Sequence, residues 1–78
     1  MEVGLFLSMD INVTVNGNKQ IISAGTTVLS LLNILNINPQ RVAVEYNMDI
    51  LERNQFGLIS LKENDKLEII SFVGGGNG

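Results

Sequence analysis

The sequence contains no cysteine, no histidine and no tryptophan, and it has a single proline. Without cysteine there can be no disulfide, and without cysteine or histidine the usual ligands of a structural zinc ion are missing. The same absences remove the commonest general base and the best nucleophile at neutral pH. A mechanism based on carboxylates alone would need an enclosed pocket, which so small a domain could hardly build beside a core. We therefore expect no catalytic residue, no metal site and no bound cofactor.

Positive charge and long apolar runs are also scarce. Five basic residues face eight acidic ones, which gives a net charge of −3, and the basic residues are scattered along the chain. Nucleic-acid binding requires a clustered positive field, so nucleic acid is not an expected partner. No apolar run approaches the roughly 20 residues that span a bilayer, and Glu2 stands where a signal peptide would carry positive charge. We expect a soluble cytoplasmic protein that does not enter a membrane.

The residues that are present predict one small domain held together by apolar packing. Hydrophobic residues make up 45% of the 78 residues, which argues against disorder over most of the length. Residues 1–8 follow no periodic pattern and are interpreted as a flexible N-terminal extension, with an extra edge segment as the alternative. Met9 is then a candidate functional start. The folded domain is expected over residues 9–73, and residues 74–78 form a flexible glycine-rich tail.

A β-hairpin is predicted at the start of the domain. Residues 10–15 alternate between apolar and polar side chains, which is typical of a strand with one buried face. Asn16-Gly17 follows, and both residues tolerate the positive φ of a tight hairpin turn. Residues 19–22 are expected to return antiparallel.

One helix is predicted after the hairpin. Thr26 or Thr27 can cap its N-terminus with a hydroxyl group. The residue before a proline disfavours the α region, so we expect the helix to stop before Asn38-Pro39. Leu29 and Ile34 widen the apolar stripe, and we expect loops to cover them. The stripe itself recurs at helical spacing and consists of Val28, Leu31, Leu32 and Leu35.

The second half predicts two further strands joined by an irregular crossover. We expect a strand at residues 42–46, followed by a turn at 47–49 that leads into a short apolar segment. A loop with one helical turn is expected within 52–60. A turn at 63–66 and a last strand at 67–73 complete the domain. In the turn at 63–66, Asn64 is the residue that best accepts a left-handed backbone conformation. The order of elements favours an α+β fold of the ubiquitin-like, β-grasp class. In that class one main helix packs across one face of a mixed sheet, and the last strand lies parallel to the first.

Phe72-Val73-Gly74-Gly75-Gly76 is the most informative stretch for function. A strand leads directly into glycine, and no helix follows that could make this a phosphate-binding loop. Glycine lacks a Cβ atom, so such a backbone can pass through a narrow channel and present its end to another protein's active site. A frayed terminus without function is the alternative.

Residues 9–76 resemble the ThiS family, the sulfur carriers of thiamine biosynthesis. The resemblance rests on Asn16-Gly17, on the helix entry at 24–28, on the run from Val42 to Arg53, and above all on the segment from Leu61 to the Phe-Val-Gly-Gly-Gly ending. It implies that an ATP-dependent, E1-like activating enzyme adenylates the C-terminal glycine carboxylate. A sulfur donor protein then converts the adenylate to a thiocarboxylate, and thiazole synthase takes the sulfur. By this resemblance ATP is used by the partner and the chain itself is not an enzyme.

The resemblance also assigns the site and leaves alternatives. Gly76 is the expected reactive terminus, although the chain continues with Asn77-Gly78. Asn77 and Gly78 are either removed before activation or are additions to the natural chain. A third alternative is that the tail reacts at the carboxylate of Gly78. If none of these holds, the chain is an inactive relative. Asn64 also departs from the family's usual glycine. The small subunit of molybdopterin synthase, a ubiquitin-like protein modifier and a plain interaction domain are the alternative functions.

A partner-binding surface is predicted beside the tail. If Leu67 and Ile69 face the helix, Ile70 and Phe72 lie on the opposite face of the last strand. These two residues, with Val73, Gly74 and Gly75, are the candidate partner-binding residues, and coverage by residues 50–59 is the alternative. The separated carboxylates Asp10, Asp49 and Asp65 are better explained by turn hydrogen bonds than by a metal site.

Overall fold

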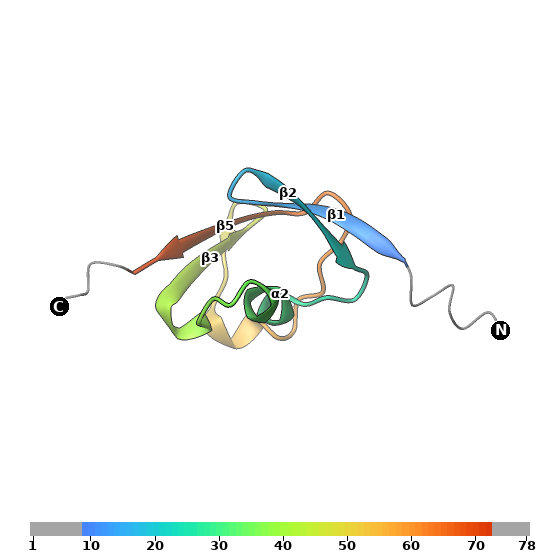
Figure 1. The fold of residues 1–78 in the computed structure, drawn as a ribbon. Helices are drawn as coiled ribbons and strands as arrows, with labels where there is room; N and C mark the ends of the chain where they lie inside the picture. Colours follow the sequence, from blue (N-terminus) through green and yellow to red (C-terminus); the bar gives the residue numbers. More distant parts are fainter. Residues whose placement is uncertain (1–8, 73–78) are drawn as a thin grey trace.

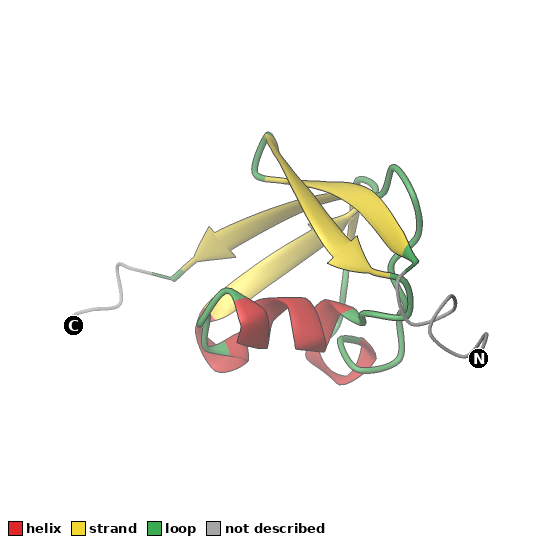
Figure 2. Ribbon diagram, turned by 45° about the vertical axis from the view of Figure 1, so that its right-hand side comes forward, coloured by secondary structure: helices red, strands yellow, loops and turns green. Residues whose placement is uncertain are grey.

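The computed structural model describes residues 9–72, which form a five-stranded sheet with one α-helix across one face (Figure 1, Figure 2). The strand order is β2-β1-β5-β3-β4. β1 and β5 run parallel, and the other neighbouring pairs are antiparallel. This is the predicted β-grasp arrangement. The elements are β1 (Asp10–Val15), β2 (Asn18–Ser23), α2 (Val28–Ile34), the 3₁₀ turn η1 (Pro39–Arg41), β3 (Val42–Tyr46), β4 (Asp49–Ile50), the 3₁₀ turn η2 (Arg53–Gln55) and β5 (Lys66–Ser71).

The predicted hairpin is confirmed, with the turn at the expected residues. Asn16 and Gly17 have φ values of 50° and 85°. Two consecutive positive φ angles match the right-handed twist of the flanking strands, which is why this dipeptide favours a two-residue turn. The pairing of Val15 with Asn18 follows at once, and it sets the register of the whole ladder.

Helix α2 begins as predicted at a threonine cap. The Thr27 hydroxyl accepts a hydrogen bond from the backbone N–H of Ser30 at 3.0 Å. This bond satisfies one of the N–H groups that the first helical turn leaves without an intrahelical partner. Thr26 has a different role, because its hydroxyl donates to the Ser23 carbonyl at 2.7 Å.

The helix ends earlier than predicted and for a different reason. Asn36, with φ 60°, adopts the left-handed conformation directly after the C-cap residue. Its N–H donates to the Asn33 carbonyl at 3.0 Å, and the Ile37 N–H donates to the Leu32 carbonyl at 2.8 Å. This pair of bonds is a Schellman motif, which satisfies the last carbonyls of the helix. Asn36 therefore ends the helix, and Asn38-Pro39 belongs to the start of η1 instead.

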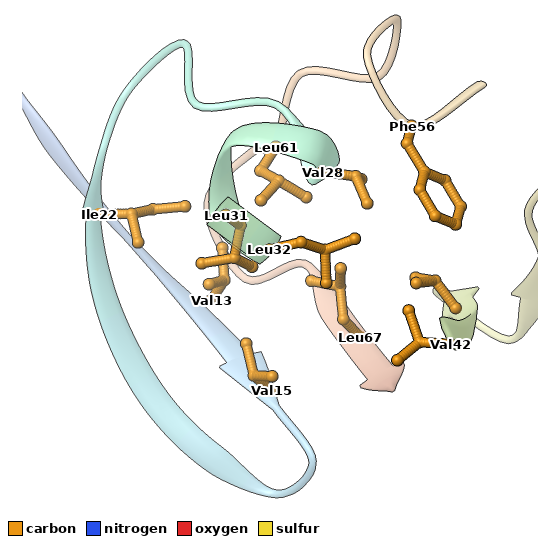
Figure 3. Close-up of a cluster of buried hydrophobic side chains, with 11 residues drawn as sticks. Val13, Val15, Ile22, Val28, Leu31, Leu32, Val42, Phe56, Leu61 and Leu67 are labelled. Carbon is orange, nitrogen blue, oxygen red and sulfur yellow. The ribbon is translucent and has the colours of Figure 1, made fainter. Parts of the chain in front are cut away.

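The core lies between α2 and the sheet, and side chains from both layers converge in it (Figure 3). The helix contributes three of the four predicted stripe residues, while Leu35 is only partly buried against the cluster. The expectation of loop cover is wrong for Ile34, which is 63% exposed. Leu29 is 36% exposed and is partly covered by the crossover loop, where its Cδ2 atom lies 3.6 Å from the position that a Cβ atom of residue 57 would take. The core residues are Val13, Val15, Ile22, Val28, Leu31, Leu32, Val42, Val44, Phe56, Leu61 and Leu67.

The last strand is shorter than predicted. β5 ends at Ser71, whose partner in β3 is Val42. The Phe72 N–H still donates to the Arg41 carbonyl at 3.0 Å. Arg41 belongs to η1, however, so β3 has no residue left to pair with Phe72. Val73, the predicted end of the strand, lies outside the described residues.

The irregular crossover between β4 and β5 follows the prediction. Its single helical turn is η2, where Glu52 and Gln55 form a capping box. Asn64 has φ 71° and so takes the left-handed conformation expected of it. The turn before β4 is also found, with positive φ at both Asn47 and Met48.

Asp65 ties this crossover to the turn after β3. Its carboxylate, buried among polar neighbours, accepts hydrogen bonds from the Tyr46 hydroxyl at 2.7 Å, the Asn47 side-chain amide at 3.1 Å and the Lys62 backbone N–H at 2.8 Å. Burial raises the pKa of Asp65, but these hydrogen bonds to the charged form outweigh it and the net pKa lies below the usual range. Burial, and then the hydrogen bond and charge of Asp65, raise the pKa of Tyr46 to about 12.

Neither a membrane span nor a metal cluster is found over residues 9–72. No helix there has the length and apolar character to cross a bilayer. No group of three or more acidic residues in that range is arranged to hold a metal ion.

We expect Asp65→Asn to reduce the free energy of unfolding by about 1–3 kcal/mol at neutral pH. With the amide oxygen facing Tyr46 and Lys62, the amide nitrogen would face the Asn47 side-chain amide, which is itself a donor. Because the folded pKa of Asp65 is below its ordinary 3.8, the stability that its charge contributes is complete at neutral pH. It is lost as the pH falls below about 4 toward the folded pKa. Urea denaturation from pH 7 to pH 2 should show wild type losing more stability than the variant. Asp10→Asn, at the exposed start of β1, is the control. A variant as stable as wild type at pH 7 would contradict the assignment.

Candidate functional site

The sheet face opposite α2 is uncovered where β5 leads toward the tail. Along β5 the side chains alternate: Leu67 is fully buried, whereas Ile70 is 49% exposed. Phe72, at the end of the described residues, is 54% exposed. The structure therefore places both predicted partner-binding residues at the surface, and residues 50–59 do not bury them.

The strand register identifies the neighbours of these residues. Residues directly opposite each other in antiparallel strands project from the same face of a sheet. Ile70 pairs with Ala43, Glu68 pairs with Glu45, and Glu45 pairs on its other side with Ile50 of β4. From the tail inward, the face thus presents an apolar row of Ala43 and Ile70 and then an acidic row of Glu45 and Glu68. Ile50, which is 64% exposed, extends the acidic row on the β4 side. We call this surface the tail-side face; it consists of Ala43, Glu45, Ile50, Glu68, Ile70 and Phe72.

Sequence reasoning found only Ile70 and Phe72 of this surface. Glu45 and Ile50 come from a part of the chain about 20 residues earlier, and only the register of β3 between β4 and β5 brings them beside Glu68. The alternation of apolar and polar residues along each strand predicts which face of the sheet a side chain occupies. Nothing in the sequence shows which strands are neighbours at a given row.

Asn16 holds the strand that leads to the tail. The β1–β5 ladder has only two paired positions, ending at Val15 and Leu67. Beyond them, the Asn16 side chain accepts a hydrogen bond from the Ile69 N–H at 2.6 Å and donates one to the Ile69 carbonyl at 3.2 Å. One side chain thus substitutes for the next backbone pair, and it anchors β5 two residues further toward the tail.

A second side chain anchors the turn before β5. The Glu63 carboxylate accepts hydrogen bonds from the backbone and side chain of Asn12, at 2.8 and 3.2 Å. These bonds lower the pKa of Glu63. The carboxylates of Glu63 and Asp65 therefore serve the structure, and neither is free to act on a substrate.

The remaining predicted site residues are Val73, Gly74, Gly75 and the terminus at Gly76 or Gly78. All of them lie outside the described residues. What the structure contributes is the surface from which they leave: Figure 1 shows β5 ending at the opposite side of the sheet from the start of β1. The end of β5 is therefore far from the start of β1 along the sheet and next to the tail-side face.

Comparison with known proteins decides the family. The model of the ThiS family matches residues 10–76. The chain belongs to the ThiS family. A crystal structure of the thiamine biosynthesis protein ThiS from Geobacter metallireducens superposes with a TM-score of 0.71 at 35% sequence identity, covering 85% of this chain and 100% of that one. The β-grasp fold is thus shared with a ThiS protein.

Two curated relatives are larger proteins. A thiazole synthase from Paramagnetospirillum magneticum is 37% identical over 65 residues, and one from Magnetococcus marinus is 39% identical over 64 residues. The matches cover 83% and 82% of this chain but 20% of each relative. The chain therefore spans about a fifth of the length of these proteins, each of which contains a ThiS-like stretch within a longer polypeptide.

We expect Asn16→Gly to lower the free energy of unfolding by about 1–3 kcal/mol, since two hydrogen bonds to Ile69 are lost while the turn keeps a residue suited to positive φ. Amide hydrogen exchange should show faster exchange at the Ile69 N–H than in wild type. Asn36→Gly is the matched control, because it makes the same change at another left-handed position and should leave Ile69 unaffected. Unchanged protection of Ile69 in Asn16→Gly would show that the anchor does not hold β5.

Proposed function

We propose that this protein is a sulfur carrier for thiazole formation in thiamine biosynthesis. The observation that supports it best is family membership over residues 10–76, a range that includes the triple glycine. The solved relative from Geobacter metallireducens is named as a thiamine biosynthesis protein, which favours the thiamine pathway over the molybdopterin alternative. In this function the chain is a co-substrate of other enzymes and contributes a carboxyl group together with the surface by which they recognise it.

The proposed chemistry takes place at the carboxylate of Gly76. The carboxylate attacks the α-phosphate of ATP on an adenylating enzyme, pyrophosphate leaves, and an acyl-adenylate forms. A sulfur donor protein then delivers sulfur at the oxidation level of sulfide, whose attack on the acyl carbon displaces AMP and leaves a thiocarboxylate. The first step is needed because a free carboxylate is a poor electrophile, whereas AMP is a good leaving group. None of these steps requires a histidine or a cysteine from the carrier.

The length of the tail explains why recognition would lie on the tail-side face. The Phe72 N–H makes the last described backbone bond to the body of the domain. Four residues separate Phe72 from the end of Gly76, and a fully extended chain covers at most about 3.6 Å per residue. The reacting carboxyl group therefore reaches no further than about 14 Å from Phe72. An enzyme that acts on it must contact the domain near that residue, where Ile70 and Phe72 offer exposed apolar surface.

The thiazole synthase is the second proposed partner, and the curated relatives support it. In Paramagnetospirillum magneticum and Magnetococcus marinus, a stretch similar to this chain is part of a polypeptide named thiazole synthase. Joining two proteins in one chain raises their effective concentration for each other. Such a fusion is expected to be useful when the two parts act on each other.

The chemistry is tested by intact mass. Incubation with ATP, the adenylating enzyme of the same organism and a sulfur source should replace one oxygen atom of the protein by sulfur. The chain ending at Gly76 should react, and comparison with the chain of residues 1–78 shows whether Asn77-Gly78 must first be removed. A chain ending at Ser71 is the control and should keep its mass. If neither tail length gains the mass of the exchange, the sulfur-carrier proposal is wrong.

We expect Phe72→Ala to slow thiocarboxylate formation by about tenfold or more, because an apolar anchor at the base of the tail is removed from the contact. Its melting temperature should stay close to that of wild type, since the side chain is exposed. Ile21→Ala is the control: Ile21 is a 68% exposed apolar residue of β2, remote from the tail-side face. Equal rates for wild type and Phe72→Ala, measured in the chain ending at Gly76, would remove Phe72 from the binding surface.

A further inference from the structure

Two acidic residues stand directly opposite each other on the tail-side face. Glu45 of β3 pairs with Glu68 of β5, and residues at paired positions have Cβ atoms about 5 Å apart. Glu68 is exposed and Glu45 is partly exposed. The acidic row is flanked on the tail side by Ala43 and Ile70, and beyond Glu45 by Ile50. Apolar residues therefore border the two carboxylates on the tail side and beside Glu45, while Lys66 precedes Glu68 on the same face of β5.

The pairing of Glu45 with Glu68 does not stabilise the sheet. Like charges directly opposite each other on one sheet face destabilise the sheet. Unlike Asp65 and Glu63, neither carboxylate is described as accepting a hydrogen bond from a neighbour within residues 9–72. Lys66 lies two positions before Glu68 on the same strand face, so it can offset one of the two charges at a distance. Arg53 is directed elsewhere, to the carbonyls of Pro39 and Val42.

A cation supplied from outside would turn this repulsion into attraction. A guanidinium or ammonium group between two carboxylates is attracted to both and reduces their combined charge from −2 to −1. The chain of 78 residues carries a net charge of −3, so a basic partner would also be attracted at longer range. The surface therefore fits a partner that combines an apolar contact with a basic side chain.

We propose that Glu45 and Glu68 together bind one arginine or lysine side chain of the thiazole synthase that docks on the tail-side face. This inference rests on the proposed function. The thiazole synthase is the chosen occupant because two relatives carry their ThiS-like stretch in the same polypeptide as that enzyme. The acidic pair gives the contact its charge specificity, and Ile70 and Phe72 give it apolar area.

The test measures binding of this chain to the thiazole synthase of the same organism by isothermal titration calorimetry at low and high salt. The double variant Glu45→Gln/Glu68→Gln should bind about tenfold more weakly at low salt, and its affinity should depend less on salt than that of wild type. Its melting temperature should be equal to or higher than that of wild type, because the repulsion is gone. If the pair had a structural role instead, the double variant would lose both binding affinity and melting temperature.

The single variant Glu68→Gln is compared with Asp10→Asn, which removes the same charge at the far end of β1. Only the first should weaken binding. The proposal is overturned if the double variant binds within twofold of wild type, if its salt dependence is unchanged, or if wild type fails to bind the synthase. An effect confined to the adenylating enzyme would also overturn it. These outcomes are distinct from failure of the proposed function, in which no thiocarboxylate forms at all.

Discussion

The packing of one short helix against one face of the sheet is the constraint on which the structure depends. A helix of seven residues is too short to be stable alone. Val28, Leu31 and Leu32 are almost completely buried against the strands, and they form the centre of the core. With no disulfide to assist, this layer pair is the domain's main source of stability. It also determines which sheet face stays open.

That open face is where the proposed activity is located. A two-layer domain can cover only one side of its sheet, so the other side must either be polar or be covered by a partner. At the β2 side it carries the polar residues Asn12, Thr14 and Lys19, together with exposed Ile21. At the β5 side it carries exposed Ile70 and Phe72, next to the base of the tail. These two apolar residues at the base of the tail agree with a domain that presents its terminus to larger enzymes.

Side chains of asparagine and acidic residues complete the sheet where backbone pairing stops. Asn16 replaces a backbone partner of Ile69, and Asp65 joins the crossover to Tyr46 and Asn47. These ties surround β5, whose parallel ladder with β1 is only two pairs long. The strand that leads to the proposed reactive terminus is thus held by neighbours on both sides. A rigid base for a glycine tail limits where the tail can reach, and this favours a defined docking geometry.

The sequence by itself determined the features that depend on a few consecutive residues. Alternation defined β1 and β3 to the residue, and Asn16-Gly17 defined the hairpin turn. The two threonines at 26 and 27 defined the helix start to within one residue, and the structure selects Thr27. Each reflects a local preference of backbone or side chain. The helix end was encoded just as locally, in the left-handed tendency of Asn36, but the later proline masked that signal.

Only the tertiary structure decided which residues meet across the sheet. Glu45 lies beside Glu68, and Asn16 reaches Ile69, because of strand neighbours and register. The burial of Ile34 and Ile70 was likewise decided only by the tertiary structure. The sequence pattern around an apolar residue is the same whether or not another layer covers it. Periodicity assigns a side chain to a face. It does not reveal whether that face is covered, because coverage depends on how distant segments pack.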